Sequence, residues 1–433
     1  MSSTRLTILF APLEYHGHVN ACHGIAERLR DRGHRIVFAI DSLFEGKLRA
    51  HGFEEQLLSL PDHLQDDESE VEFINRNHDL FKADPLTVAD KFIAYGFHIF
   101  LRNLKAIDAQ YRQILAKVRP HLIAIDSYMG SPALIGSGIP FILIYSAAPL
   151  MLFNDHRLPP PWSGFGMNSD KTSWTAFRDR FEEMFADVKR DTNAWFAAEG
   201  IGQLPASGSN SLLHPESRYL NVYMYPKELD YHSETQSLAP NWKRVDGFVR
   251  TTGETFTIPE SLAERSGKLV MLSMGSIGCA LLDLMVRLTT ILAKSEHRFI
   301  VTKGPLHDQY ELPDNMYGQP FLPQTAVLPM IDLVITHGGN NTVTECFYYG
   351  KPMLVMPLFA DQLDNAQRIR ETGLGLTLNP FFCTEDQLLK TVDTIVNDLS
   401  LAEMMALIGE RIRSTDDKSV IADIIEDICV NKK

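Results

Sequence analysis

One stretch of the chain, residues 321–365, restricts its possible folds more than any other. It reads FLPQTAVLPMIDLVITHGGNNTVTECFYYGKPMLVMPLFADQLDN. The apolar run LVIT leads into two glycines, NNTVTECFYYG has the length of a short helix, and KPMLVMP is a second apolar run. This order predicts a strand, a helix and a parallel strand, with a glycine-rich turn at the end of the first strand.

The polar turns that follow the two strands have the composition of a binding site. The first turn contributes donors and small residues, namely His337, Gly338, Gly339, Asn341 and Thr342. Backbone N–H groups at the start of a helix lack partners within the helix, so they are free to bind an anion. The second strand is followed by Asp361 and Gln362, a carboxylate and an amide suited to hydroxyl groups. A phosphate site beside a polyol site indicates a sugar nucleotide.

Composition narrows the class of protein. With 433 residues, 45% of them hydrophobic, the chain is long enough for two or three globular domains. Its net charge of -14 argues against nucleic acid or an anionic membrane as a partner. The five cysteines are scattered and odd in number, which predicts a reducing compartment and neither a disulfide framework nor a zinc site.

The two ends of the sequence carry no targeting or membrane-spanning pattern. LTILFAPL leads into a polar loop where a signal peptide would have a cleavage site. The last stretch, IADIIEDICVNKK, has acidic residues among its apolar ones and is unsuited to a bilayer. We therefore expect a soluble, cytoplasmic protein without a membrane partner.

The first half of the chain reads as α/β. It opens with a strand over 6–12, a polar loop over 13–20, a helix over 21–33 and a strand over 34–40. Further on, the continuous apolar runs LIAI and FILIY predict strands of a parallel sheet that is covered on both faces. Residues 154–211 are irregular and rich in aromatic side chains, which predicts mobile helices and loops inserted in this domain.

A second α/β series makes up the rest of the chain. Residues 237–250, with Pro240 and Gly247, are expected to form the crossover between the halves. The layout predicts two Rossmann-like, doubly wound domains that face each other across a cleft, over residues 1–240 and 241–433. The last helix, at about 411–433, is expected to pack back on the first domain.

Two polar residues of the first half follow buried strands at one edge of its predicted sheet. His18 carries an imidazole, a group whose unperturbed pKa is near neutrality and suits a general base for a hydroxyl group, although a structural loop histidine would fit as well. Asp126 ends the strand LIAID, where a carboxylate either orients an imidazole or caps the following helix. His16 is the rival to His18 as the base.

These motifs resemble a known family. Residues 321–362 resemble the signature of the inverting UDP-glycosyltransferases of family 1, which have the GT-B fold, and HGHVN and Asp126 resemble that family's catalytic pair. The chain is most similar to the soluble branch, which includes bacterial macrolide glycosyltransferases and arthropod enzymes without a membrane anchor. The family pattern Gly-His-hydrophobic falls on Gly17 and His18, so the resemblance implies His18 as the base and Asp126 as its partner. It also implies an acceptor-binding first domain and a UDP-sugar-binding second domain.

The resemblance also assigns the donor contacts. It implies that UDP is bound by residues of the second domain, namely Ser276, Phe321, Gln324, His337, Gly339, Asn341, Thr342 and Glu345. Glu345 is expected at the ribose hydroxyls, and its alternative is a charge on a solvent-facing helix side. Asp361 and Gln362 are expected at the sugar hydroxyls, with a helix N-cap as the alternative. Phe321 stands where many relatives have a base-stacking Trp, and it lacks the indole donor. Asn340 replaces a Trp that is common in plant members.

The resemblance implies transfer of a hexose, expected to be glucose from UDP-glucose, to a hydroxyl of a flavonoid, phenol or macrolide. The expected role is detoxification by conjugation of foreign compounds. No cofactor is expected, and the sequence has neither an Asp-x-Asp pair nor a His/Cys cluster with metal-ligand spacing. The acceptor pocket is assigned to apolar residues of the first domain that also suit its core, namely Phe92, Phe97, Phe153 and Met184.

Two other functions fit this layout. A UDP-sugar epimerase shares the two domains, needs no acceptor pocket, and would isomerise a UDP-sugar without any acceptor. A non-catalytic protein that sequesters hydrophobic compounds would bind a flavonoid tightly without releasing UDP from UDP-glucose. Sequestration requires neither His18 nor Asp126, so their presence disfavours it.

Overall fold

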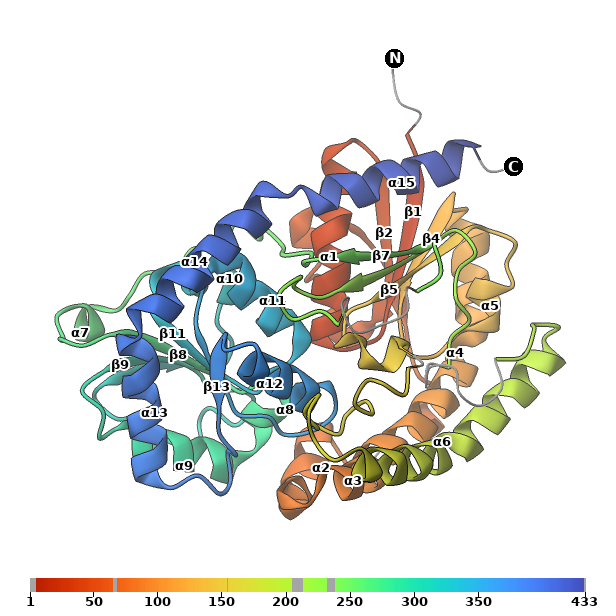
Figure 1. Ribbon diagram of the computed structural model, residues 1–433. Helices are drawn as coiled ribbons and strands as arrows, with labels where there is room; N and C mark the ends of the chain where they lie inside the picture. Colours follow the sequence, from red (N-terminus) through yellow and green to blue (C-terminus); the bar gives the residue numbers. More distant parts are fainter. Residues whose placement is uncertain (1–4, 65–67, 154, 205–212, 232–237, 432–433) are drawn as a thin grey trace.

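A computed structural model of the protein describes residues 5–64, 68–153, 155–204, 213–231 and 238–431. Two parallel sheets form its framework (Figure 1). The first sheet has the strand order β3-β2-β1-β4-β5-β6-β7. Its strands are β1 (Thr7–Pro12), β2 (Arg35–Asp41), β3 (Glu54–Leu58), β4 (Leu122–Asp126), β5 (Phe141–Tyr145), β6 (Leu220–Met224) and β7 (Trp242–Val245).

The second sheet has the order β10-β9-β8-β11-β12-β13, which is the doubly wound Rossmann order. Its strands are β8 (Leu269–Ser273), β9 (Arg298–Thr302), β10 (Met316–Gln319), β11 (Leu333–Thr336), β12 (Met353–Val355) and β13 (Gly375–Thr377). Strands such as β4 and β8 are buried along their whole length, because helices cover both faces of each sheet. The predicted fold class is confirmed.

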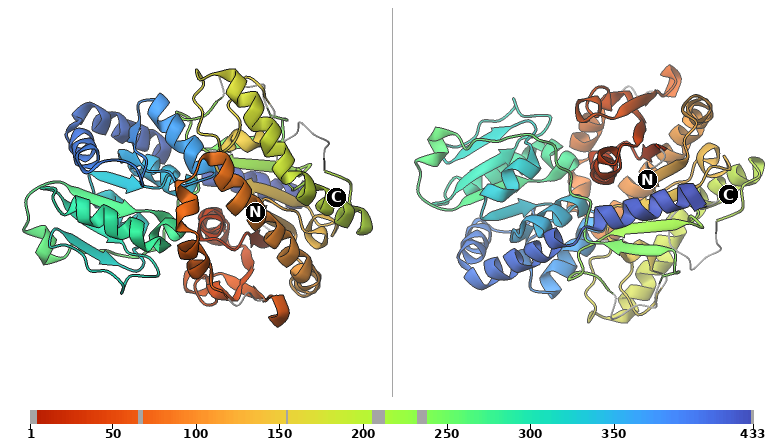
Figure 2. Two further views of the ribbon diagram at one scale, coloured as in Figure 1. Left: turned by 90° about the horizontal axis from the view of Figure 1, so that it is seen from below. Right: turned by 90° about the horizontal axis from the view of Figure 1, so that it is seen from above.

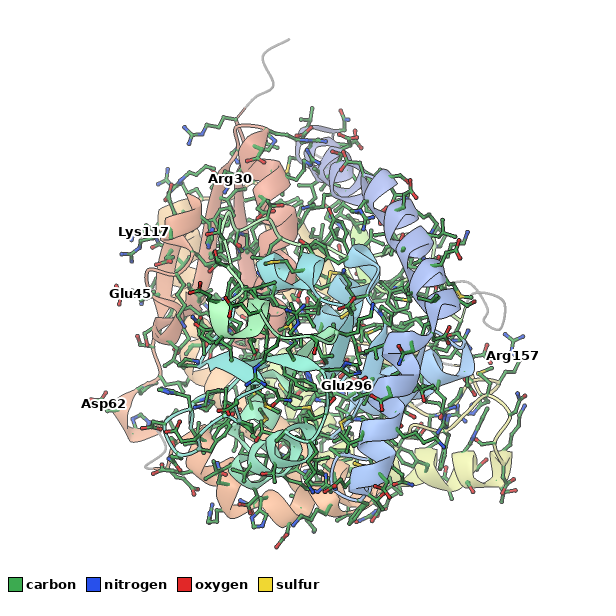
Figure 3. All side chains as sticks on the ribbon, turned by 90° about the vertical axis from the view of Figure 1, so that its left-hand side faces the viewer. Arg30, Glu45, Asp62, Lys117, Arg157 and Glu296 are labelled. Carbon is green, nitrogen blue, oxygen red and sulfur yellow. The ribbon has the colours of Figure 1, made fainter. Side chains whose placement is uncertain are left out.

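The α-helices lie on the faces of the sheets and between them (Figures 1 and 2). Those of the first domain are α1 (His16–Asp31), α2 (Glu70–Arg76), α3 (Pro85–Val88), α4 (Tyr95–Val118), α5 (Pro132–Ile135) and α6 (Lys171–Ala198). The later ones are α7 (Glu260–Ala263), α8 (Gly275–Ala280), α9 (Leu282–Leu292), α10 (Gln324–Val327), α11 (Asn340–Tyr349), α12 (Asp361–Glu371), α13 (Glu385–Asn397), α14 (Leu399–Ser414) and α15 (Asp417–Asn431). Charged side chains such as Lys117, Glu45 and Asp62 are exposed and project from the outline in Figure 3.

The first helix begins earlier than the sequence predicts. We expected a loop over residues 13–20, but α1 starts at His16, so the HGH motif forms the first turn of a helix. The N-cap residue Tyr15 is extended and makes no side-chain capping bond, so the usual sequence signal for a helix start is missing.

The aromatic insertion contains one long helix, where the sequence predicts helices and loops without giving their bounds. Within residues 154–211, where we expected several helices and loops, α6 runs for 28 residues from a side-chain cap at Asp170. Its buried residues recur at helical spacing, among them Trp174, Phe177, Phe181 and Phe185. Residues 154 and 205–212 lie outside the described part of the chain.

The crossover between the halves differs from the expected one. Residues 242–245, inside the predicted crossover, form β7 and pair parallel with β6, so the first sheet continues beyond residue 240. At the other end of the chain, α15 reaches the first domain and packs across α1 (Figures 1 and 2). Ile421, Ala422, Ile425 and Ile428 of α15 are buried in one core with β1 and β2 of the first sheet.

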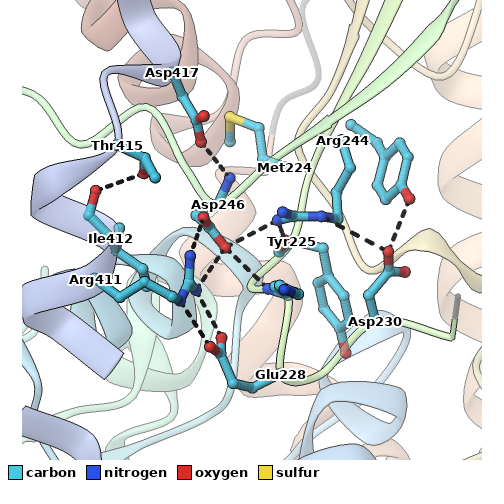
Figure 4. Close-up of polar contacts among 12 residues, drawn as sticks. Met224, Tyr225, Glu228, Asp230, Arg244, Asp246, Arg411, Ile412, Thr415 and Asp417 are labelled. Atoms are coloured by element: carbon cyan, nitrogen blue, oxygen red, sulfur yellow. Dashed lines mark hydrogen bonds and ion pairs between the residues drawn. The ribbon is translucent and has the colours of Figure 1, made fainter. Parts of the chain in front are cut away.

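A buried ionic network fastens this crossing (Figure 4). Arg411 of α14 donates to Glu228 at 2.9 Å and to Asp246 at 2.9 Å. The Asp246 side chain is 2% exposed and also accepts from Arg244 of β7. Although burial opposes it, the bonds from Arg411 and the charge of Arg244 lower the pKa of Asp246. The network thus favours the charged form of Asp246 at the domain junction.

We expect Arg411→Met to destabilise the protein by about 2 kcal/mol, since it leaves two carboxylates with reduced compensation and the guanidinium itself is partly exposed. Urea unfolding at pH 7 would measure the loss. Arg190→Met is the matched control, because the Arg190–Asp187 pair is 67% exposed on both sides and its loss should change stability far less than Arg411→Met does. A carboxyl group whose pKa is lower in the folded than in the unfolded protein stabilises the fold at pH values above the unfolded pKa. The difference in stability between wild type and Arg411→Met should therefore shrink as the pH falls below about 4. An equal effect of the two substitutions would contradict this role.

Candidate active site

The carboxyl ends of β1 and β4 bring the two predicted catalytic residues together. Pro12 is the register partner of Asp126, and the N–H of Leu13 donates to the Asp126 carbonyl at 2.7 Å. The imidazole Nδ1 of His18, in the first turn of α1, lies 2.8 Å from Oδ1 of Asp126. Since a carboxylate only accepts, Nδ1 carries the proton and Nε2 carries the lone pair. Among the described residues Nε2 has no hydrogen-bond partner, so it is available to a substrate hydroxyl.

The alternative role of Asp126 as a helix cap is not what the structure shows. The helix that follows β4, α5, has Ser131 at its N-cap. The Ser131 hydroxyl and the N–H of Ala133 both donate to Asp108 of α4, at 2.6 and 3.0 Å. Asp126 is therefore free for His18. The Ser146 hydroxyl, just beyond β5, also lies 3.1 Å from Nδ1 of His18.

The glycine-rich turn after β11 surrounds His337. A Cβ added to Gly275 or Gly339 would collide with its imidazole, so the ring packs between two backbone segments. Burial lowers the pKa of His337 to about 4, against the opposing effect of its bond to the Ser273 carbonyl. The ring is therefore neutral at pH 7 and would bind a phosphate as an N–H donor. Ser276, exposed in the first turn of α8, lies at the end of the neighbouring strand β8.

The start of α11 faces the catalytic helix across the domain junction. A Cβ on Gly17 would lie 3.2 Å from the amide nitrogen of Asn341, so only glycine leaves this approach unobstructed. Asn340, in place of the plant Trp, is 4% exposed and donates to the carbonyls of Ser146 and Met224, at 3.0 and 2.8 Å. The two domains are thus joined by hydrogen bonds at this helix end.

The predicted ribose contact is deeply buried. Glu345 is 4% exposed, so the alternative of a solvent-facing charge is wrong. Its Oε2 accepts from Gln324 at 2.6 Å, and Gln324 also lies 3.3 Å from the Thr342 hydroxyl. Its Oε1 accepts from Arg250 at 2.5 Å. Three of the predicted donor residues therefore form one network, and Arg250 joins it without having been predicted.

Phe321, the predicted base contact, is 60% exposed and keeps a free ring face. Its ring centroid lies 6.0 Å from that of His16 on α1. An exposed aromatic ring at the mouth of the site suits a stacking role. His16, the alternative to His18 as the general base, thus lies on the side where the nucleobase is predicted to bind.

The predicted sugar residues lie at the start of α12, opposite His18. Oδ2 of Asp361 accepts from the Ala148 N–H of the first domain at 3.1 Å. Burial raises the pKa of Asp361 to about 6, although the Ala148 bond and the charge of His18 oppose the rise. Gln362 accepts from the N–H groups of Leu358 and Phe359, which fixes its side chain. Neither residue is the N-cap, which is Ala360 with the unusual φ of 52°.

The four predicted acceptor residues have different surroundings. Phe97 is 2% exposed and packs on Tyr128 at 5.7 Å, whose ring in turn lies 5.4 Å from His18. Phe92 packs on Phe359 of the second domain at 5.3 Å. Phe153 lines a cavity of about 440 Å³ beside β7, and Met184 of α6 is 8% exposed in the core. Their contact with an acceptor stays a prediction.

Sequence reasoning missed three polar residues at the site. Ser146 follows the strand FILIY at the same sheet edge as Asp126, so its position was a usable signal. Asp364 accepts from the N–H of Trp162 at 2.7 Å, and its pKa is raised by burial and then by Asp361. Arg250 lies in an irregular connection, where no pattern marks it. The described residues contain no group of three or more His, Cys, Asp or Glu that would hold a metal ion. None of the helices in the described ranges is long and apolar enough to cross a membrane.

Two facing parallel sheets, a His–Asp pair on one and a glycine-rich turn with an Asp–Gln pair on the other, define a GT-B glycosyltransferase fold. Residues 235–410 match the family model described as UDP-glucoronosyl and UDP-glucosyl transferase. Over these residues the chain matches this family of UDP-glycosyltransferases, in agreement with the resemblance seen in the sequence.

Individual relatives match shorter stretches. UDP-glucuronosyltransferase 1A6 of Oryctolagus cuniculus is 42% identical over 94 residues, which are 21% of this chain and 18% of the rabbit protein. The uncharacterized UDP-glucosyltransferase YojK of Bacillus subtilis is 30% identical over 115 residues, 27% of this chain and 28% of the bacterial protein. The chain thus matches between 18% and 28% of the length of these two relatives.

Solved structures match the whole chain at low identity. The glycotransferase of kitacinnamycin superposes with a TM-score of 0.72 at 19% identity, over 98% of this chain and 99% of that one. The spinosyn forosaminyltransferase superposes with a TM-score of 0.65 at 17% identity, over 99% of this chain and 100% of that one. These likenesses establish the fold.

Proposed function

We propose that this protein is an inverting UDP-glycosyltransferase that moves a hexose from a UDP-sugar to a hydroxyl of a hydrophobic small molecule. The observation that carries the proposal is the His18–Asp126 bond at 2.8 Å, close enough to Asp361 for the charge of His18 to act on the Asp361 pKa. A base and a sugar-binding carboxylate are thereby brought to the same place from two domains.

In the proposed reaction, Nε2 of His18 takes the proton from the acceptor hydroxyl while Asp126 stabilises the imidazolium that forms. The acceptor oxygen attacks the anomeric carbon opposite the diphosphate, and the bond from this carbon to the diphosphate oxygen breaks. An α-linked donor therefore gives a β-glycoside. The charge that develops on the diphosphate is taken up by the neutral N–H of His337, the start of α11 and Ser276.

The charges around the sugar position favour glucose over a uronic acid. Asp361 is half-buried beside Asp364, and the pKa of Asp364 is raised by burial and by repulsion from Asp361. The carboxylate of a glucuronic acid would bring a further acidic group beside these two carboxyl groups, whereas the glucose C6 hydroxyl adds no charge. UDP-glucose is therefore the proposed donor, and conjugation of foreign phenols, flavonoids or macrolides is the proposed role.

The direct test is a panel of UDP-glucose, UDP-glucuronic acid and UDP-galactose against phenolic, flavonoid and macrolide acceptors, with products identified by mass spectrometry. We expect a β-glucoside and an equal amount of UDP, and the same rate with EDTA because protein donors neutralise the diphosphate. An isomerised UDP-sugar in the absence of acceptor would indicate an epimerase. Tight acceptor binding without UDP release would indicate sequestration.

A further inference from the structure

The connection between β7 and α7 is packed between the two domains. A Cβ on Gly247 would lie 3.0 Å from Cβ of Thr344 on α11. The N–H of Thr251 donates to Glu27 of α1 at 2.7 Å. The connection is therefore held from both sides at the place where Arg250 projects. Arg250 is 8% exposed.

Arg250 and Gln324 each donate a hydrogen bond to a different oxygen of the Glu345 carboxylate. Nη1 of Arg250 lies 2.5 Å from Oε1 of Glu345, and Nε2 of Gln324 lies 2.6 Å from Oε2. A carboxylate has about four acceptor positions, so these two bonds leave about two open. The 2′- and 3′-hydroxyls of a ribose are two adjacent donors, and their number matches the two open acceptor positions.

The guanidinium also compensates the charge of Glu345. A buried carboxylate without its cation is costly, and it would turn away or take up a proton. Either change removes acceptor positions that face a ribose. Burial, and then the charges of Lys47 and Arg250, lower the pKa of His16, whose ring lies beside Phe321. The charge of Arg250 thus also acts at His16 and Phe321, where the nucleobase is predicted to bind.

We propose that Arg250 is a positioning residue that fixes Glu345 for the ribose 2′-hydroxyl, and that it thereby sets a preference for ribonucleotides over 2′-deoxyribonucleotides. The inference rests on the proposed function, because it assumes that UDP binds beside Glu345. A residue outside both sheets would then govern nucleotide choice.

The test is calorimetric binding of UDP and of 2′-deoxy-UDP to the wild type and to Arg250→Met, Arg250→Lys and Arg298→Met. Arg298 is a matched control, since it binds the Leu262 carbonyl at 2.7 Å at the amino end of β9, the sheet edge away from the site. We expect the wild type to prefer UDP at least about tenfold, since a site that hydrogen-bonds a hydroxyl rejects the analogue without it. Arg250→Met should weaken the binding of UDP about thirtyfold and the binding of 2′-deoxy-UDP less than about threefold. Arg250→Lys should recover part of the preference, and Arg298→Met should keep all of it.

In turnover assays, Arg250→Met should raise the KM for the UDP-sugar by a larger factor than it lowers kcat. Equal losses for the two nucleotides, or no preference in the wild type, would overturn the inference. If Arg250→Met fails to fold, the same comparison in Arg250→Lys decides: a larger loss for UDP supports the inference, and equal losses overturn it. A wild type that binds neither nucleotide would instead refute the proposed function.

Discussion

Replacement of His18 by alanine is expected to lower kcat for glucosyl transfer about a thousandfold, because a positioned base contributes about 10²–10⁴ to such rates. The KM for the UDP-sugar should change little, since the proposed donor contacts belong to the second domain. Asp126→Asn should give a loss of similar order, because an amide can stabilise the wrong tautomer of the imidazole. Initial rates with UDP-glucose and a phenolic acceptor measure both effects.

His16→Ala is the matched control for this experiment. His16 is on the same helical turn and is exposed, and its ring lies 5.1 Å from Phe44 and 6.0 Å from Phe321. We expect kcat within about threefold of the wild type, because an exposed ring has no bond to Asp126 to lose. If His18→Ala turned over at the wild-type rate, or if His16→Ala lost activity instead, the assignment of the base would be wrong.

Asp361→Asn is expected to change stability and activity in opposite directions. The rise in the Asp361 pKa from 3.8 to about 6 in the folded protein corresponds to about 3 kcal/mol of destabilisation at neutral pH. The sign follows because a carboxyl group with a raised pKa resists ionisation in the fold, and the cost is complete above pH 6. Below about pH 4 the group is protonated in both states, and the cost disappears. Asparagine never ionises, and its oxygen still accepts from Ala148.

Asp361→Asn should therefore raise the free energy of unfolding by about 1–3 kcal/mol at pH 7.5 and leave it unchanged near pH 4. The kcat/KM for UDP-glucose should fall about 10–100-fold, because neutral acceptors form weaker bonds to sugar hydroxyls than a carboxylate does. Urea unfolding at both pH values and initial rates measure the two effects. Asp283→Asn is the control, with a side chain 85% exposed at the start of α9. A destabilised Asp361→Asn variant would contradict the desolvation argument.

The contact between His18 and Asp126 was predictable because it depends on local strand order. His18 and Asp126 follow strands β1 and β4, which are neighbours in a doubly wound sheet, so both side chains reach one edge. The choice between a dyad and a helix cap was not predictable from the residues. It depends on Asp108, 18 positions before Asp126, which binds the Ser131 hydroxyl and so supplies the helix start.

The elements that the sequence reading missed or left without bounds lack a clear signal or have one that is easily overlooked. β7 is an edge strand with the sequence WKRV, of which only Trp242 and Val245 are buried, so it lacks an apolar run. α6 does show helical spacing, but its many aromatic residues obscure it. The Arg250–Glu345 contact joins residues 95 positions apart through an irregular connection, and no local pattern encodes it.

The crossing of α15 has a consequence for the construction of chimeras. The isoleucines of this helix belong to the core of the first domain, although they come last in the sequence. An exchange of second domains between related enzymes at a single junction would therefore also replace part of the core of the first domain. A grafted half should keep residues 417–431 of the recipient. The recombination boundary that preserves both cores thus has two points, one in the connection after β7 and one before α15.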